Sequence, residues 1–167
     1  MHNELTKMDI QKMQEEIDYR SLVQRPKLLE DLATARAFGD LSENFEYKAA
    51  KLELRRCDSR LRYLKRMIST AKVIQTDERE GVVGLYDRVT IYYEEDDEEE
   101  VISIVTTVRQ KAAQGLISKE SPLGRAVLGR KEGDRAEVRL SENDSYFIQI
   151  RLIEKGEDDG SVELNKF

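Results

Sequence analysis

Two carboxylates surrounded by cations lie in the stretch "ARAFGDLSENFEYKAAKLELRR", residues 35–56. Asp40 and Glu43 fall where one segment of helical character ends and the next begins. The neighbouring basic residues are Arg36, Lys48, Lys51, Arg55 and Arg56. Proteins usually hold Mg²⁺ through one or two carboxylates together with waters and substrate phosphates. The stretch therefore predicts a partial metal site that a phosphate-bearing nucleic acid would complete.

The same two acids also fit a purely structural role. Asp40 as N-cap with Glu43 three residues later has the spacing of a capping box, which satisfies free backbone amides at a helix start. Ser42 is a rival N-cap, and a helix starting there would leave both carboxylates available for chemistry. The residues alone leave both alternatives open.

Few other chemistries are available to this chain. The only histidine is His2 and the only cysteine is Cys57, so histidine-based triads and Cys/His zinc sites are not expected. One cysteine permits no disulfide within the chain, which favours a reducing compartment. Charged residues make up 37% of the sequence, and no apolar run approaches the roughly 20 residues of a membrane span. We expect a cytoplasmic protein with no membrane partner.

A helical hairpin would position the two carboxylates. Apolar residues recur at alternating spacings of three and four, which predicts a coiled-coil helix over 44–71 of roughly 40 Å. The predicted seam is Tyr47, Ala50, Leu54, Cys57, Leu61, Leu64, Ile68 and Ala71. The preceding arm is less regular, and Pro26 should kink or break it. Gly39 is expected to end that arm, so the acids would lie at the turn of an antiparallel coiled coil.

The charge distribution differs between the two halves of the chain. Residues 1–75 contain 15 Lys/Arg and 12 Asp/Glu, whereas residues 76–167 contain 13 and 22. Residues 48–72 alone hold nine basic residues against two acids. One predicted flank of the second helix carries Lys48, Lys51, Arg55, Arg62 and Lys65. This split indicates two domains with different partners, and the basic flank favours a polyanion.

After residue 71 the pattern changes to short strands rich in β-branched and aromatic residues. One short helix interrupts them, with Ser121 as N-cap, Pro122 at the first helical position and Gly129 after its end. We therefore expect an α+β fold of two domains: the hairpin, and a small antiparallel sheet with one helix.

The predicted linker lies at residues 75–81, which gives domains at 1–76 and 77–167. The seven consecutive acids Glu94–Glu100 are expected to form a solvated turn between two strands. The last residues, "GEDDGSVELNKF", are expected to form a mobile tail.

Two motifs carry a resemblance to a known family. "ARAFGDLSENFEYKAAK" resembles the tip motif of the bacterial transcript cleavage factors GreA and GreB, and "LISKESPLGRAVLGRKEGD" resembles the second signature of that family. The likeness runs over most of residues 10–155. The resemblance implies an N-terminal antiparallel coiled coil followed by a domain similar to FK506-binding proteins, which agrees with the architecture expected from the residues.

The resemblance also implies a mechanism. Such factors insert the coiled coil into the secondary channel of RNA polymerase and stimulate cleavage of backtracked RNA by the polymerase, so the factor is not itself an enzyme. By motif match, Asp40 and Glu43 would be the catalytic acids and would hold Mg²⁺ jointly with the polymerase. The implied partners are RNA polymerase, the nascent RNA 3′ end and the DNA–RNA elongation complex.

Further site residues follow from the same match. The expected RNA-binding residues are Arg36, Asn44, Lys48, Lys51 and Arg55. The expected polymerase-docking residues are Glu120, Ser121 and Pro122.

Two other functions fit the sequence less well. A channel regulator of the same shape that inhibits without promoting cleavage would not need the acid pair. A prolyl isomerase or chaperone acting through the C-terminal domain would need an apolar aromatic pocket. The chain has no tryptophan to form the floor of such a pocket.

Overall fold

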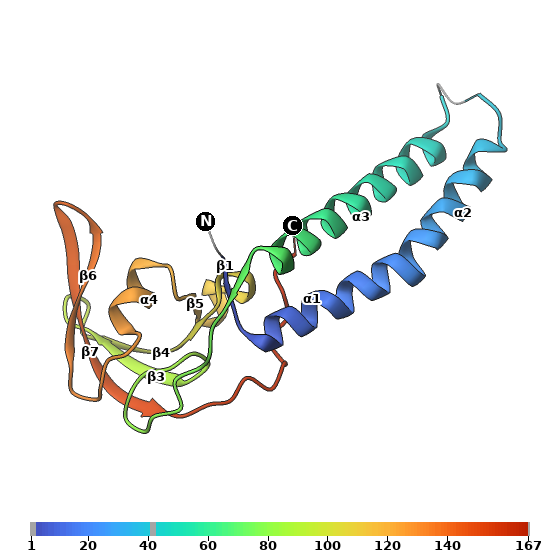
Figure 1. Ribbon diagram of the computed structural model, residues 1–167. Coiled ribbons are helices and arrows are strands. Elements are labelled where there is room, and N and C mark those ends of the chain that lie inside the picture. Colours follow the sequence, from blue (N-terminus) through green and yellow to red (C-terminus); the bar gives the residue numbers. More distant parts are fainter. Residues whose placement is uncertain (1–2, 41–42, 167) are drawn as a thin grey trace. The chain divides into compact units, whose positions relative to one another are not determined.

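The computed structural model describes residues 3–40 and 43–166 and contains a helical hairpin and a five-stranded sheet (Figure 1). Its contacts divide the chain into two compact units. The first consists mainly of Ile10–Lys72, and the second of Glu4–Asp9 together with the chain from Val73 onwards. The two-domain α+β expectation is confirmed. Among the described residues, no helix is long and apolar enough to cross a bilayer.

The hairpin contains two arms joined by the segment that carries the acids (Figure 1). Its helices are α1 (Lys7–Tyr19), the π-helix η1 (Arg20–Gln24), α2 (Arg25–Arg36) and α3 (Phe45–Ser69). Short strands β1 (Asn3–Leu5) and β2 (Ala71–Val73) pair as a two-stranded sheet. The predicted helix over 44–71 thus ends two residues early, because Ala71 belongs to β2.

The seam of the hairpin is buried mainly in its base half. The buried residues of this unit are Met13, Ile17, Ala35, Cys57, Arg60, Leu61, Leu64 and Met67. Cys57 is therefore a core residue, as its position in the predicted seam indicated. Tyr47, Ala50 and Leu54, nearer the turn, are only half-buried. Arg60 is also buried in the seam. Its charge is compensated there, because Nε and Nη2 donate to the Glu16 carboxylate at 2.8 and 3.1 Å.

Pro26 interrupts the first arm as expected, although the form of the interruption differs. The helix does not break but widens into a π-helical turn, in which the Arg25 N–H bonds to the Arg20 carbonyl. Pro26, which has no N–H to donate, then occupies the first turn of α2, directly after this π-helical turn. The wide turn thus accommodates the proline within one continuous arm.

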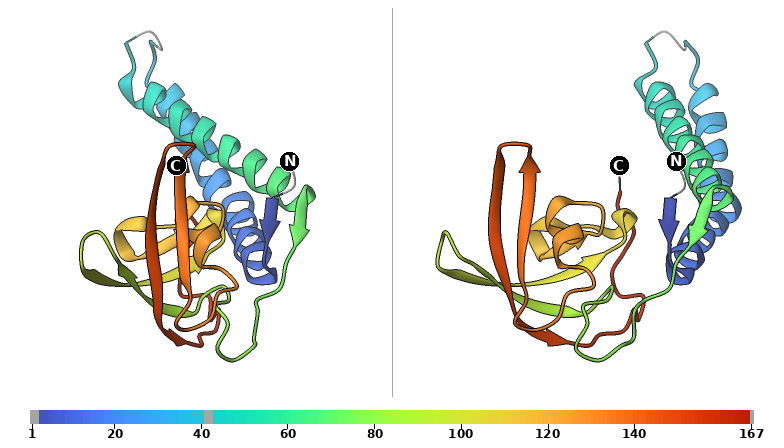
Figure 2. Two further views of the ribbon diagram at one scale, coloured as in Figure 1. Left: turned by 90° about the vertical axis from the view of Figure 1, so that its left-hand side faces the viewer. Right: turned by 60° about the vertical axis from the view of Figure 1, so that its left-hand side comes forward.

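The second unit is built on a five-stranded sheet in the order β5-β4-β3-β7-β6 (Figure 2). The strands are β3 (Arg88–Tyr93), β4 (Glu98–Val105), β5 (Leu116–Ser118), β6 (Arg135–Ser141) and β7 (Asp144–Glu154). The helical elements are η2 (Thr107–Arg109), η3 (Ala112–Gln114) and α4 (Pro122–Val127). Residues Ala126 and Val127 of α4 join the buried aliphatic side chains of the strands in one core.

The sheet is not wholly antiparallel, which corrects the expectation from sequence. β5 runs parallel to β4, with Ser103 opposite Leu116. The chain returns for this pairing through η2 and η3, and Gly115 makes the last turn with a φ of +74°. The acidic run is also not wholly a turn, because Glu98–Glu100 lie in β4 and pair with β3.

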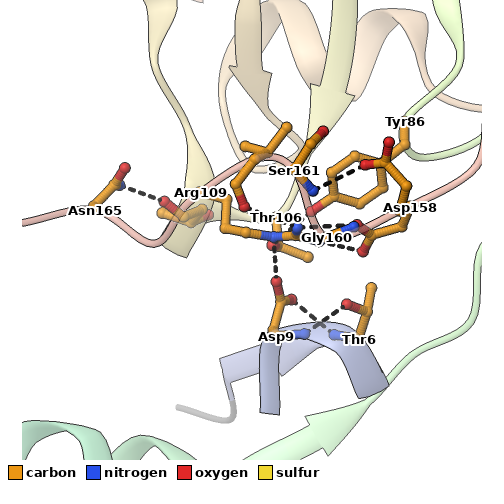
Figure 3. Close-up of polar contacts among 12 residues, drawn as sticks. Thr6, Asp9, Tyr86, Thr106, Arg109, Asp158, Gly160, Ser161 and Asn165 are labelled. Carbon is orange, nitrogen blue, oxygen red and sulfur yellow. Dashed lines mark hydrogen bonds and ion pairs between the residues drawn. The ribbon is translucent and has the colours of Figure 1, made fainter. Parts of the chain in front are cut away.

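The C-terminal segment is bound to the second unit around the buried Arg109, so the expected mobile tail is wrong (Figure 3). Arg109 donates from Nη1 to Asp158 at 2.9 Å and to the Val162 carbonyl at 3.1 Å. The Asn165 N–H also bonds to the Val108 carbonyl at 2.8 Å. A charged side chain without exposure needs such partners, and here the tail supplies them.

Arg109 also has partners in the first residues of α1 and in the core of the second unit. Its Nε donates to Asp9 at 2.7 Å, and neither side chain is exposed. Asp9 also accepts from the Thr6 N–H, while Thr6 Oγ1 accepts from the Asp9 N–H, which forms a capping box. The guanidinium lies 4.5 Å from the centroid of the Tyr86 ring. Burial raises the pKa of Tyr86 to about 12.

Candidate functional site at the hairpin turn

The N-cap of α3 is Asn44, which corrects the capping-box hypothesis for Asp40. The Asn44 side-chain oxygen accepts from the Tyr47 N–H at 3.0 Å. Its amide nitrogen donates to the Ala35 carbonyl at 2.7 Å, near the end of α2. One side chain therefore starts the second arm and ties it to the first. The Asn44 side-chain oxygen accepts the backbone hydrogen bond at the start of α3, which is the role that the capping-box hypothesis assigned to Asp40.

Both predicted catalytic acids are solvent-exposed in the connection between the arms. Asp40 follows Gly39, whose φ of +104° ends the first arm as expected, and Glu43 immediately precedes the cap Asn44. Glu43 takes part in no ion pair among residues 3–40 and 43–166. The rival cap, Ser42, lies outside the described residues. The fold thus leads the chain out of both helices at the acids, where a partner can reach them.

Two of the predicted RNA-binding cations contact one aromatic ring. Arg36 of α2 and Lys51 of α3 lie 5.7 and 5.8 Å from the centroid of the Tyr47 ring. A hydrogen bond from Arg36 lowers the pKa of the Tyr47 hydroxyl, and the nearby charge of Lys51 acts in the same direction. Cations are attracted to the negative face of an aromatic ring. Tyr47 therefore holds positive charge from both arms close to the turn.

The other cations lie along α3. Lys48 is exposed, with its Nζ 5.7 Å from the centroid of the Phe45 ring, and Arg55 is exposed two turns further on. Arg36, Lys48, Lys51 and Arg55 take part in no ion pair within the described part of the chain. An uncompensated basic stripe of this kind attracts phosphate without reading sequence.

The second motif forms the start of α4 in the other unit. Ser121 Oγ accepts from the Gly124 N–H at 3.0 Å and donates to the Ser118 carbonyl at 2.7 Å. Pro122 occupies the first turn, as expected. Glu120 is exposed and lies between Lys119 and Arg125, whose hydrogen bonds lower the pKa of its carboxyl group. The predicted docking residues are thus adjacent in the loop that leads into α4 of the second unit.

Comparison with known protein families decides the assignment. The family description "Transcription elongation factor, N-terminal" matches residues 3–73, and "Transcription elongation factor, GreA/GreB, C-term" matches residues 78–155. The chain belongs to the GreA/GreB family of transcription elongation factors. The two matches cover both structural units, in the order expected from the two motifs.

Individual GreA proteins are similar over most of the chain. Transcription elongation factor GreA of Thermoanaerobacter pseudethanolicus is 36% identical over 151 residues, covering 90% of this chain and 94% of the relative. GreA of Geobacillus kaustophilus is 40% identical, covering 81% of this chain and 86% of the relative. GreA of Bacillus subtilis is 38% identical, covering 77% and 82%.

Among solved structures, the GreA factor homolog 1 protein of Thermus thermophilus matches 93% of this chain and 100% of its own, at 21% identity. Its TM-score is 0.42, so the assignment to the GreA/GreB family rests on the sequence matches.

Sequence reasoning missed two structural roles at the turn of this GreA/GreB-family protein. Asn44 was expected only as an RNA-binding residue, although asparagine directly before a helical pattern is a strong N-cap signal. Tyr47 was read as a seam residue, and its contacts with Arg36 and Lys51 depend on how the two arms pair. Only the first of these could be read from neighbouring residues in the chain.

Proposed function

We propose that this GreA/GreB-family protein binds RNA polymerase and stimulates cleavage of backtracked RNA by the polymerase itself. The observation that carries the proposal is the exposed pair Asp40 and Glu43 at the turn of a hairpin whose cap is provided by Asn44. The family match supplies the setting, transcription elongation. The hairpin would reach the catalytic centre through the secondary channel, and the RNA-cleaving chemistry would remain with the polymerase.

The residues at the turn fit a shared Mg²⁺ ion. Exposed carboxylates are hard oxygen ligands of the kind that Mg²⁺ prefers. No group of three or more His, Cys, Asp or Glu side chains able to hold a metal occurs in residues 3–40 and 43–166. Asp40 and Glu43 would therefore hold the ion only together with ligands from the polymerase and the RNA. The bound metal would polarise water and stabilise charge on the reacting phosphate oxygens.

The cations beside the turn support an RNA partner. Arg36, Lys48 and Lys51 would neutralise phosphates of the extruded 3′ segment, with Arg55 further along the same arm. Asn44 would position the acids, since its cap and its bond to Ala35 fix the entry of α3. Such contacts need no base readout, which suits a factor that acts on many transcripts.

The start of α4 would dock on the polymerase. Glu120, Ser121 and Pro122 lie on a loop held by the Ser121 cap, so their geometry is fixed before binding. A Cβ at Gly124 would lie 2.0 Å from the Ser118 carbonyl oxygen, so only glycine fits this close approach. Docking through the second unit would raise the effective concentration of the hairpin turn at the catalytic centre.

The alternative of a prolyl isomerase gains no support from the second unit. A cavity of about 150 Å³ is lined by Tyr93, Tyr146 and Phe147, but Glu95 and Asp96 line it as well. Two carboxylates in so small a cavity would disfavour an apolar proline ring.

Stalled, backtracked elongation complexes provide the test. Addition of the wild-type protein with Mg²⁺ should shorten the RNA from its 3′ end, whereas Asp40→Asn or Glu43→Gln should abolish the stimulation and leave binding to polymerase nearly intact. Glu46→Gln is a matched control, because it removes the same charge from an exposed residue of the first turn of α3. Equal cleavage by all three variants would remove the catalytic role of the pair. Binding that blocks the channel without cleavage would instead favour the inhibitory regulator.

A further inference from the structure

Two phenylalanines flank the acids at the hairpin turn, and both are largely exposed. Phe38 stands two residues before Asp40 and is 69% exposed, and Phe45 stands two residues after Glu43 and is 80% exposed. Neither belongs to the buried core of the chain. A single exposed apolar side chain needs no explanation. Two aromatic rings within eight residues, on either side of the acid pair, are the feature to explain.

Phe45 is fixed more firmly than a loop residue. It is the first residue of α3, directly after the Asn44 cap that ties both arms together. The Lys48 Nζ lies 5.7 Å from the centroid of its ring. The ring and the ammonium group are therefore neighbours on one face of α3, because residues three apart in a helix lie one turn apart. An apolar face beside a cation matches a nucleotide, which presents a flat base and a charged phosphate.

The charges around the rings favour nucleic acid over an apolar protein surface as the occupant. Arg36 precedes Phe38 by two residues, and Lys48 and Lys51 follow Phe45 on the same helix, all three without an ion-pair partner in the described residues. Burial of these cations against an apolar protein wall would carry a desolvation cost, whereas RNA phosphates would compensate them. Proteins that bind single strands combine the same two elements, cations for the backbone and aromatic rings for the bases.

We propose that Phe45, with Phe38 on the other arm, forms a stacking site for an unpaired nucleobase of the RNA that the acid pair serves. This inference rests on the proposed function and deepens it. Phe45 would be a positioning residue: stacking holds one extruded base, which places the neighbouring phosphate beside Asp40 and Glu43. The site would accept any base, because every base has an aromatic face.

The test separates stacking from cleavage by working in the Asp40→Asn background, where the RNA is expected to stay intact. Backtracked complexes would carry the fluorescent base 2-aminopurine at each extruded position in turn. Full-length factor should quench its fluorescence at one position, and Phe45→Ala should restore the fluorescence. Phe45→Tyr should quench as wild type does, and Phe45→Leu should behave as Phe45→Ala. A merely apolar contact would be kept by leucine.

Cleavage kinetics supply the second readout, with Asp40 intact. Phe45→Ala should lower the cleavage rate at subsaturating factor by about 5- to 150-fold, the range that corresponds to the usual worth of one base–aromatic stack. An abasic nucleotide at the quenched position should lower the wild-type rate equally and leave the Phe45→Ala rate unchanged. The combined loss should not exceed either single loss.

The outcomes distinguish the two proposals. Quenching that depends on Phe45, in a factor that stimulates no cleavage, would support the stacking site and refute the proposed function. Cleavage that depends on Asp40 but is insensitive to Phe45→Ala and to abasic RNA would refute the stacking site alone. Recovery of full activity by Phe45→Leu would also overturn it, since the ring would then serve only as apolar surface.

Discussion

Replacement of Asp9 by asparagine should destabilise the second unit strongly, although Asp9 is far in sequence from the sheet. The substitution keeps the shape of the side chain and an oxygen for the Thr6 amide, but it removes one of the two carboxylates around Arg109. Neither Arg109 nor Asp9 is exposed, so solvent cannot replace the lost charge. Breaking a buried ion pair costs about 3–5 kcal/mol. We expect the lower end, about 3 kcal/mol, because Asp158 still pairs with the guanidinium.

Thermal unfolding followed by circular dichroism would measure the effect. For a domain of roughly 100 residues, each kcal/mol lowers the melting temperature by about 4–8 °C, so a shift of at least about 12 °C is expected if the unit unfolds independently. Asp158→Asn should shift the midpoint less, because the Asp158 side chain retains 11% exposure. Asp159→Asn, next to it and exposed, is the matched control and should change little.

The ranking of the three variants is the decisive result. Equal midpoints for Asp9→Asn and Asp159→Asn would show that the Arg109 cluster does not hold the first residues of α1 and the C-terminal segment on the second unit. A large shift for Asp158→Asn with none for Asp9→Asn would assign the stabilisation to the C-terminal segment alone.

Three further predictions test other parts of the molecule. Lys51→Glu combined with Arg55→Glu should weaken engagement of long extruded RNA more than docking, and should reduce the slope of log activity against log salt by about 1.4. Gly124→Ala should unfold the docking loop or displace it, because the added Cβ would lie 2.0 Å from a carbonyl oxygen, and polymerase binding measured by competition should fall. Hydrogen bonding to Arg135 lowers the pKa of Glu94 from 4.5 to about 2. The Glu94–Arg135 ion pair should therefore stabilise the folded state fully above pH 4.5, and this contribution should be lost as the pH falls toward 2. Arg135→Met should return that pKa toward 4.5 in a carboxyl NMR titration.

Local patterns in the sequence predicted much of this fold. The seam of α3 follows from apolar spacing, and the buried Cys57, Leu61 and Leu64 confirm it. Ser121 followed by Pro122 predicted the start of α4, because cap and first-turn preferences act between neighbouring residues. The strands β3, β4, β6 and β7 were visible as runs of β-branched and aromatic residues.

Features that depend on distant residues were not predictable in the same way. The C-terminal segment looked mobile because its composition is polar, yet Asp158 and Asn165 bond to residues some fifty positions earlier. Arg109 gave no sign of burial, since a lone arginine in a polar stretch is usually exposed. The parallel pairing of β5 follows from the path of the chain through η2 and η3, and three residues of strand carry too little pattern to reveal it.

The candidate site shows how a structural explanation and a functional one can be separated. Asp40 and Glu43 had the spacing of a capping box, and that role would have explained their types without any function. The structure gives the cap of α3 to Asn44, whose amide also closes the turn onto Ala35. Asp40 is therefore not needed to start the helix, and Glu43 is exposed beside it in the chain. The turn thus presents exposed carboxylates close in sequence to cations that take part in no ion pair within the described residues, and a metal ion and an RNA backbone would complement these two sets of charges. That complementarity links the fold of the hairpin to the RNA cleavage proposed for it.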